Sequence, residues 1–357
     1  MNIIKATKRY EDWLGARLRL IPEDLKRKHA AMAADRFSFL RATFYRWMQL
    51  WPEACAECAG APRLLAVGDL HVENFGTWRD VEGRLVWGIN DFDETYELPY
   101  TGDLVRLAAS AHLAIAEEHL SIGPKDACDA ILDGYEKGVT AGGAPFVLEE
   151  HHPWLRSMVT GALRDPQQFW PKLEGFAEVS DVPAGACKAM ERMLPAGDLN
   201  YRVVHRIAGL GSLGRERFVA IGECFGAKIA REAKALAPSA CAWARRVKCR
   251  VIHYQEVLDR AVRSPDPFVR MKEPWLVRRL APDCSRVELA SMPKVRDEIR
   301  LLHSMGFETA NVHLGTRKAA RLILRDLHKR RPGWLHRAAA NMVKATTKDW
   351  ETWRQRS

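Results

Sequence analysis

The chain lacks the long apolar segments that cross membranes. No run of about eighteen apolar residues occurs anywhere in its 357 residues. Its first residues, MNIIKATKRYEDW, contain no continuous hydrophobic stretch of the kind found in a secretory signal. Low-complexity tracts are missing too, and the composition is ordinary for a globular protein. We therefore expect a cytoplasmic protein that has no membrane partner and is large enough for two lobes.

Closely spaced cysteine pairs are scarce. Eight cysteines are scattered along the chain, and only Cys55 and Cys58 have the spacing of metal ligands. No second close pair completes a structural zinc site, so this class of site is disfavoured. In a cytosolic protein such cysteines are expected to be reduced and mostly packed as small apolar side chains.

The positive charge is concentrated near the end of the chain. The formal net charge is +10, and residues 317–357 contain twelve Lys or Arg residues against three acidic ones. Such a tail can contact nucleic acid or another polyanion. The favoured alternative is a solvated face of amphipathic helices, because no recognisable nucleic-acid-binding motif accompanies the charge.

The most informative polar residues lie in two short motifs. GDLHVENFG starts at Gly68 and NDFDE spans 90–94. Within twenty-five positions they place Asp69, His71, Asn74, Asp91 and Asp93. Phosphoryl transfer needs a carboxylate near the attacking hydroxyl and hard oxygen ligands that hold Mg²⁺ on the phosphates. The two motifs contain both kinds of group.

Short apolar segments precede both motifs. Residues 63–68 and 84–90 have the composition of buried strands that end in polar loops. Two such strands would bring the acidic groups to one edge of a sheet. Each motif taken alone could instead be an Asx-type turn that stabilises its own loop.

The whole chain divides into three predicted parts. Residues 1–198 are predicted to form a helical lobe with the catalytic and metal loops, including helices over 1–53, 102–120 and 123–140. Residues 199–285 are rich in β-prone runs separated by glycine turns, typical of a small antiparallel sheet, and 247–254 and 273–281 look like two further strands. Residues 286–357 are predicted to be basic helices. Asp103 is placed at the start of a helix, where a carboxylate suits the terminal amides.

A third motif lies in the β-rich part. Gly209, Gly211, Ser212 and Gly214 belong to GLGSLG, whose glycines let backbone N–H groups approach phosphates. A strand-like segment follows it, which disfavours a dinucleotide-binding loop and favours a strand–loop–strand cover over ATP. The cation expected on the next strand is Lys228, Arg231 or Lys234, and we prefer Arg231 and Lys234.

GDLHVEN resembles the catalytic loop H-G-D-x-H-x-x-N of the aminoglycoside and choline phosphotransferases. The resemblance implies that Asp69 is the catalytic residue and Asn74 a metal ligand. NDFDE is similar to the second metal motif of these enzymes, with Asp91 the expected ligand and Asp93 its neighbour. Asp103 resembles the Asp that ends that block. Val67 departs from the pattern, which has His at this position.

Five segments also occur in the order seen in an uncharacterised bacterial family, domain of unknown function 2252, which is related to the protein-kinase-like fold. They are FSFLRATF, GDLHVENFG, INDFDET, DLVRLAAS and GLGSLG. The similarity runs from about Phe37 to Arg279. It implies an α+β, two-lobed fold. In ordinary kinases the glycine-rich loop precedes the catalytic loop, whereas here it follows it. The fold is therefore expected to be circularly permuted. Two-lobed folds can tolerate permutation where the new termini lie in exposed segments. The family pattern places Lys near Arg231.

The expected function is transfer of a phosphoryl group from ATP, with Mg²⁺, to a hydroxyl group of a small substrate. His71 either contacts a phosphate or acceptor or is a hydrogen-bonded loop residue. Nucleotidyl transfer from ATP would use the same ligands. The alternative class is a non-catalytic kinase-like module that binds a nucleotide or nucleic acid.

Overall fold

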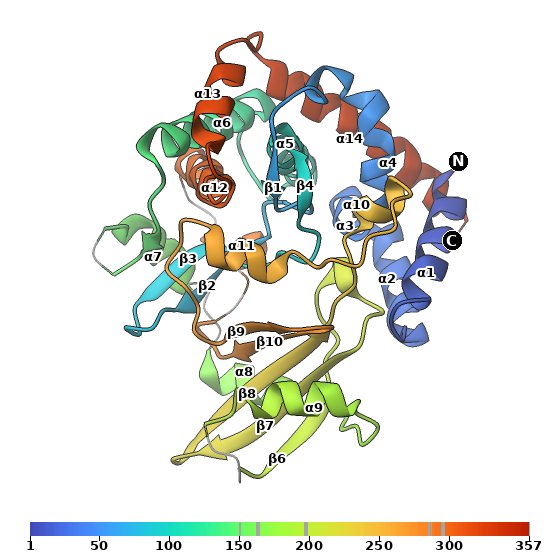
Figure 1. The fold of residues 1–357 in the computed structure, drawn as a ribbon, viewed down its shortest axis with the longest axis vertical. Coiled ribbons are helices and arrows are strands. Elements are labelled where there is room, and N and C mark those ends of the chain that lie inside the picture. Colours follow the sequence, from blue (N-terminus) through green and yellow to red (C-terminus); the bar gives the residue numbers. More distant parts are fainter. Residues whose placement is uncertain are drawn as a thin grey trace.

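The computed structural model describes residues 1–149, 151–161, 165–195, 199–284, 286, 288–293 and 297–356. Helices and antiparallel sheets are mixed along this part of the chain, so the protein is of the α+β class, as expected. In Figure 1 most helices gather at one end of the molecule, and a five-stranded sheet lies at the other. The two termini lie on the same side.

The N-terminal helices form because their apolar residues recur at helical spacing. They are α1 (Ile3–Gly15), α2 (Pro22–Ala34), α3 (Arg36–Ala42) and α4 (Phe44–Ala54), followed by the short turn η1 (Ala56–Cys58). Asp35 caps α3, since its carboxylate accepts the Ser38 amide at 2.6 Å. Phe39, Phe44 and Trp47 are buried in the main core, as expected of an apolar stripe.

The segments before the two acidic motifs are strands, but they do not share a sheet. Strand β1 (Arg63–Ala66) pairs with β4 (Tyr96–Pro99), whereas β3 (Leu85–Ile89) pairs with β2 (Phe75–Arg79) and β5 (Phe146–Val147). The expectation of a single sheet edge is therefore wrong. Asn74 holds the two motifs together instead, because its side-chain amide donates to the backbone carbonyls of Asp69 and Asp91, each at 3.1 Å.

Three buried helices support this region: α5 (Thr101–Ala116), α6 (Pro124–Ala141) and α12 (Glu298–His313). Glycines let α6 and α12 approach closely. A Cβ atom on Gly134 would lie 1.9 Å from the His303 carbonyl oxygen, and one on Gly306 would lie 2.0 Å from that of Ile131. Any larger residue at either position would force the helices apart.

The five-stranded sheet is antiparallel throughout, with the order β6-β7-β8-β10-β9. Its strands are β6 (Tyr201–His205), β7 (Arg217–Cys224), β8 (Ala227–Ala235), β9 (Val269–Lys272) and β10 (Trp275–Leu280). Helices α8 (Pro166–Glu174) and α9 (Ala184–Glu191) cover opposite faces, since they pack against alternate residues of β7 and β8. The antiparallel sheet predicted from Asn200 onward is confirmed.

One predicted strand is wrong. Residues 247–253 have no regular structure, and Tyr254 begins α11 (Tyr254–Arg260). Val247 and Val251 are half exposed and only Ile252 packs in part against the core, so the apolar residues that suggested a strand do not form a buried strand face. The other elements are α7 (Pro153–Gly161), α10 (Ala240–Ala244), the turns η2 (Leu210–Ser212) and η3 (Leu289–Ser291), α13 (Ala319–Leu327) and α14 (Trp334–Arg354).

The proposed boundaries between parts fall at residues 198 and 285, which lie outside the described residues. The five-stranded sheet occupies the chain between them. None of the helices described here is long and apolar enough to span a membrane.

Candidate active site

A buried network on α5 and α12 fixes the start of the GDLHVEN loop. The Asp103 carboxylate accepts the Val67 and Gly68 amides at 2.7 and 2.9 Å. His313 contacts the same carboxylate at 3.0 Å, and Tyr135 contacts the other ring nitrogen of His313 at 2.8 Å. Asp103 lies in the first turn of α5, as expected, and its carboxylate also stabilises the start of the GDLHVEN loop.

Gly68 is required at its position in this loop. It has φ +84°, and a Cβ atom would lie 2.3 Å from the backbone oxygen of Glu94. Val67, where the phosphotransferase pattern has His, contributes its backbone amide to Asp103 and is buried.

Arg106 orients Asp69. Its Nε donates to Asp69 Oδ1 at 2.8 Å, and the guanidinium is completely buried. One turn further along α5, the Ser110 hydroxyl accepts the Val72 amide at 3.0 Å. Asp103, Arg106 and Ser110 are spaced by three and four residues, so they lie on one face of the helix, toward the loop. Burial raises the pKa of Asp69, and the charge of Arg106 opposes this shift.

The second oxygen of Asp69 faces the glycine-rich loop. A Cβ atom on Gly211 would lie 3.4 Å from Asp69 Oδ2. Gly211 and Asp69 belong to different sections of the chain, 142 positions apart in the sequence. The structure therefore brings the first and third motifs together.

His71 is held by its own loop. Its Nδ1 accepts the Glu73 amide at 3.2 Å, and its ring meets Phe37 edge-on. Burial and the charge of Arg41 lower the pKa of His71 well below the ordinary value. The ring is therefore neutral at physiological pH, with the proton on Nε2.

Asn74 and Asp91 combine the features of a metal-binding pair. Asn74 is buried, and its Oδ1 accepts no hydrogen bond from any described residue while its Nδ2 makes two. The Asp91 side chain is 42% exposed, whereas that of Asp93 is 9% exposed. Asp91 thus faces the cavities beside the loop, whereas Asp93 is buried.

Lys234 lies between the two aspartates. Its Nζ is 2.6 Å from Asp93 Oδ1 and 3.4 Å from Asp91 Oδ1. Burial and the adjacent charge of Asp91 raise the pKa of Asp93 to about 6. For Asp91, the effect of burial is outweighed by the charges of Lys234 and Arg278, which lower the pKa. Asp91 is therefore the ionised member of the pair in mildly acidic solution.

The other two candidate cations of β8 lie elsewhere. Arg231 is on the opposite face of the strand, where its Nε donates to the Met193 carbonyl at 2.7 Å and its guanidinium stacks on Phe268. Lys228 is at the outer end of the strand and pairs with Glu174 at 2.7 Å. Side chains alternate across a strand, so residues 231 and 234 cannot face the same cavity.

The glycine-rich loop links β6 to β7, so it has the predicted strand–loop–strand setting. Gly209 and Gly214 have φ +75° and +95°. The Ser212 hydroxyl accepts a hydrogen bond from Arg217 at 2.7 Å. The loop is also fastened to the N-terminal part, because the Ile21 amide donates to the Gly214 carbonyl at 2.8 Å.

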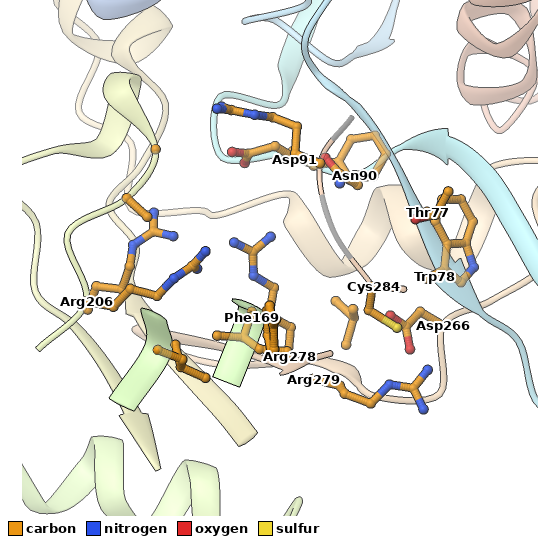
Figure 2. Close-up of a pocket in the computed structure, with 18 of the residues that line it drawn as sticks. Thr77, Trp78, Asn90, Asp91, Phe169, Arg206, Asp266, Arg278, Arg279 and Cys284 are labelled. Atoms are coloured by element: carbon orange, nitrogen blue, oxygen red, sulfur yellow. The ribbon is translucent and has the colours of Figure 1, made fainter. Parts of the chain in front are cut away.

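Beyond Asp91 lies a cavity of about 280 Å³ lined by arginines of the sheet. Figure 2 shows Arg206 and Arg278 on one side of it and Trp78 on the other, with Asp91 above. Glu232 is buried under three guanidinium groups, those of Arg206, Arg217 and Arg278. Three positive charges around one carboxylate leave an excess of two.

The donor atoms fit a divalent cation that also contacts phosphates. Mg²⁺ is usually held by one or two carboxylates together with substrate phosphates rather than by a complete protein cage. Accordingly, the described residues contain no group of three or more His, Cys, Asp or Glu side chains that could hold a metal ion by themselves. Asn74 Oδ1 and the Asp91 carboxylate would be the ligands, with the phosphates supplying the rest.

The basic C-terminal region is distant in sequence from these motifs, and one face of its helix α14 is buried in the core. Seven of its cations lie between residues 317 and 331 on and around α13, and six of them are exposed: Arg317, Lys318, Arg321, Arg325, Lys329 and Arg331. Arg330 differs, since it pairs with Asp326 at 2.6 Å.

Comparison with known proteins gives a partial match. Residues 19–151 match a family described as "Uncharacterized protein conserved in bacteria (DUF2252)". This segment contains the motifs from Asp69 to Asp103 but ends before the five-stranded sheet, so it is shorter than the similarity expected to reach Arg279. The chain matches no curated protein and no solved structure.

Several residues around the site were not anticipated from the motifs. Arg106 could have been found, because it is a charged residue three positions after Asp103 on a largely apolar helix, and therefore on the same face. Lys28, Arg206 and Arg278 carry no local signal. They reach the cavities only because α2 and the sheet pack beside the GDLHVEN loop.

Proposed function

We propose that the protein is a Mg²⁺- and ATP-dependent phosphotransferase that acts on a hydroxyl group. The observation that carries this proposal is the side chain of Asn74. Its amide nitrogen is fully used by the two motifs, and no described residue donates to its buried oxygen, which lies near the partly exposed carboxylate of Asp91. An unsatisfied buried oxygen is costly unless a ligand completes it.

Each residue has a definite task in this proposal. Asn74 and Asp91 hold the cation, which neutralises charge on the phosphates when it is bound. Arg106 keeps Asp69 Oδ1 in place, so that Oδ2 can accept the proton of the acceptor hydroxyl. Lys234 maintains the positions of both aspartates.

The nucleotide would occupy the larger cavity. Arg206 and Arg278 supply positive charge close to Asp91, and Phe92 and Tyr254 are among the apolar residues of the wall. The backbone of the glycine-rich loop would cover the phosphates from the side opposite Asp69.

We extend the proposal to the architecture. The sheet with its glycine-rich loop and the helical part with Asp69 would be the two lobes of a kinase-like fold, in circularly permuted order. The close approach of Gly211 to Asp69 supports this proposal, because a Cβ atom on Gly211 would lie 3.4 Å from Oδ2 of the proposed catalytic carboxylate.

The test is the melting temperature of the purified protein with Mg²⁺ and ATP. A ligand that binds only the folded state raises this temperature. We expect stabilisation that needs both components and is nearly abolished by Asp91→Ala. Glu82→Ala is the control, because Glu82 is an exposed acidic residue of the turn between β2 and β3.

A second variant separates binding from chemistry. Asp69→Asn should keep Mg²⁺·ATP binding within a few-fold and lower turnover by about 10²–10⁴-fold. Products of the intact protein distinguish phosphoryl from nucleotidyl transfer, since the first releases ADP and the second pyrophosphate. If Mg²⁺ and ATP leave the melting temperature of the intact protein unchanged, the nucleotide proposal is wrong.

A further inference from the structure

Lys28 is a buried cation of α2 that has no carboxylate partner among the described residues. Its side chain is 5% exposed, and Nζ donates to the Gly211 carbonyl at 2.9 Å. A lysine is rarely buried to this extent unless it is paired. Burial and the nearby charge of Arg215 lower the pKa of Lys28 to about 8, so it still carries a proton at neutral pH.

The acidic groups around Lys28 are in direct contact with other cations. Asp69 pairs with Arg106, Glu94 pairs with Arg215, and Asp91 and Asp93 share Lys234. Arg41, at the cavity wall, is in turn paired with Glu73 at 2.6 Å. None of these carboxylates forms an ion pair with Lys28, so its buried ammonium has no direct counter-charge among the described residues, which is unfavourable.

The cavity in front of Lys28 is small. It has a volume of about 50 Å³ and lies between Asp69, Asn74 and the glycine-rich loop. One water molecule needs roughly 10–15 Å³ of such space, so a group of only a few atoms fits. A phosphate has this size, whereas a sugar ring or a peptide does not.

The small cavity continues into the larger one. Asp91 and Gly209 line both. A phosphate chain that starts among the arginines of the sheet and passes Asp91 would therefore end beside Asp69 and Lys28.

We propose that the small cavity binds a phosphoryl group and that Lys28 is its counter-charge. This assignment, which rests on the proposed function for its place in the reaction, makes α2 part of the active site although none of the motifs includes it. Without an anion, the hydrogen-bond partner of Lys28 in the described part of the chain is the Gly211 carbonyl. With an anion, the ammonium gains a charge-assisted hydrogen bond close to Asp69.

The experiment compares Lys28→Met with Lys26→Met. Lys26 is an exposed residue of the same helix that pairs with Glu23 at 2.7 Å. Inorganic phosphate is titrated into the full-length protein by calorimetry, at constant ionic strength set with chloride. We expect Lys28→Met to weaken phosphate binding at least tenfold and Lys26→Met to change it less than twofold.

The melting temperature without ligand separates this role from a structural one. Removal of an uncompensated buried charge should leave the melting temperature of Lys28→Met unchanged or higher. If Lys28 only supports the loop through Gly211, the variant melts at a lower temperature and binds phosphate as the wild type does. That result overturns the proposal. Lys28→Arg, which keeps the charge, should retain part of the phosphate affinity.

Nucleotides then identify the source of the phosphoryl group. If it is the terminal group of ATP, Lys28→Met weakens Mg²⁺·ATP at least tenfold and Mg²⁺·ADP less than twofold. If an acceptor carries it, both nucleotides bind the variant normally while phosphate binding is still lost. Phosphate binding that depends on Lys28 in a protein that ignores Mg²⁺·ATP would support the anion site and contradict the proposed function.

Discussion

The GDLHVEN loop has two very different sides. On the side of α5 and α12, the buried polar groups Asp103, Ser110 and His313 are joined in hydrogen bonds. On the cavity side, Asn74 Oδ1 has no donor, and Lys28 has no counter-charge among the described residues. A satisfied network holds a loop in place, whereas unsatisfied groups need a ligand. The comparison separates the residues that support the loop from those that face the cavity.

The largest effect is expected on the supporting side. Asp103→Ala removes the acceptor of two buried amides and the partner of His313, so the free energy of unfolding should fall by roughly 3–5 kcal/mol. Chemical denaturation measures this change. Asp126→Ala, which removes an exposed carboxylate from the first turn of α6, should cost less than about 0.5 kcal/mol. Equal losses in the two variants would contradict the role of Asp103.

Lys234 tests the cavity side. Lys234→Met leaves Asp91 and Asp93 without their shared cation, so Mg²⁺·ATP affinity should fall by about 10–100-fold, which corresponds to the typical strength of a charge-assisted hydrogen bond. Calorimetric titration gives the affinity. Arg231→Met and Lys228→Met should bind normally, because their side chains lie on the other face and at the outer end of β8. Weaker binding by Arg231→Met than by Lys234→Met would reverse the assignment.

Glu308 provides a pH test on the supporting side. It accepts the Ile89 amide at 3.1 Å and the Asn311 side chain at 2.7 Å, and burial raises its pKa to about 7. A carboxyl whose pKa is raised by folding stabilises the protein fully below its unfolded value, near 4.5, and loses this contribution as pH rises through 7.

Because of Glu308, the wild type should lose roughly 1–3 kcal/mol of unfolding free energy between about pH 5 and 8, and Glu308→Gln should not show this loss. The measurement is the difference between the two stability curves, because other groups titrate in the same range. Parallel curves would mean that Glu308 does not titrate over this interval.

The smallest effect is expected from the exposed basic region. Replacing Arg321, Arg325 and Lys329 by Gln in one triple variant should change the free energy of unfolding by less than about 0.5 kcal/mol and leave Mg²⁺·ATP binding unchanged. Salt-dependent RNA binding that the triple variant loses, and that Asp69→Ala keeps, would favour the nucleic-acid alternative.

Sequence reasoning was most accurate for local structure that depends on residues close together in the sequence. The loop from Gly68 to Asn74 and the acidic motif from Asp91 follow strands, as their apolar runs indicated, and the glycine-rich loop joins two strands. Reasoning failed at residues 247–253, which have no regular structure and in which Val247 and Val251 are half exposed. It also paired Arg231 with Lys234, although an odd spacing on a strand places two side chains on opposite faces.

The order of residues alone was sufficient to predict that Asp69, Asn74 and Asp91 lie near one another, because they lie within one short segment of chain. The partners around these residues come from parts of the chain that are far away in the sequence. Lys28 and Gly211 are 183 positions apart, and Asp91 and Lys234 are 143 apart. No local pattern encodes such pairs, since they arise from the way α2 and the sheet pack around the loop. These long-range contacts determine which charges remain unmatched and therefore what the site can bind.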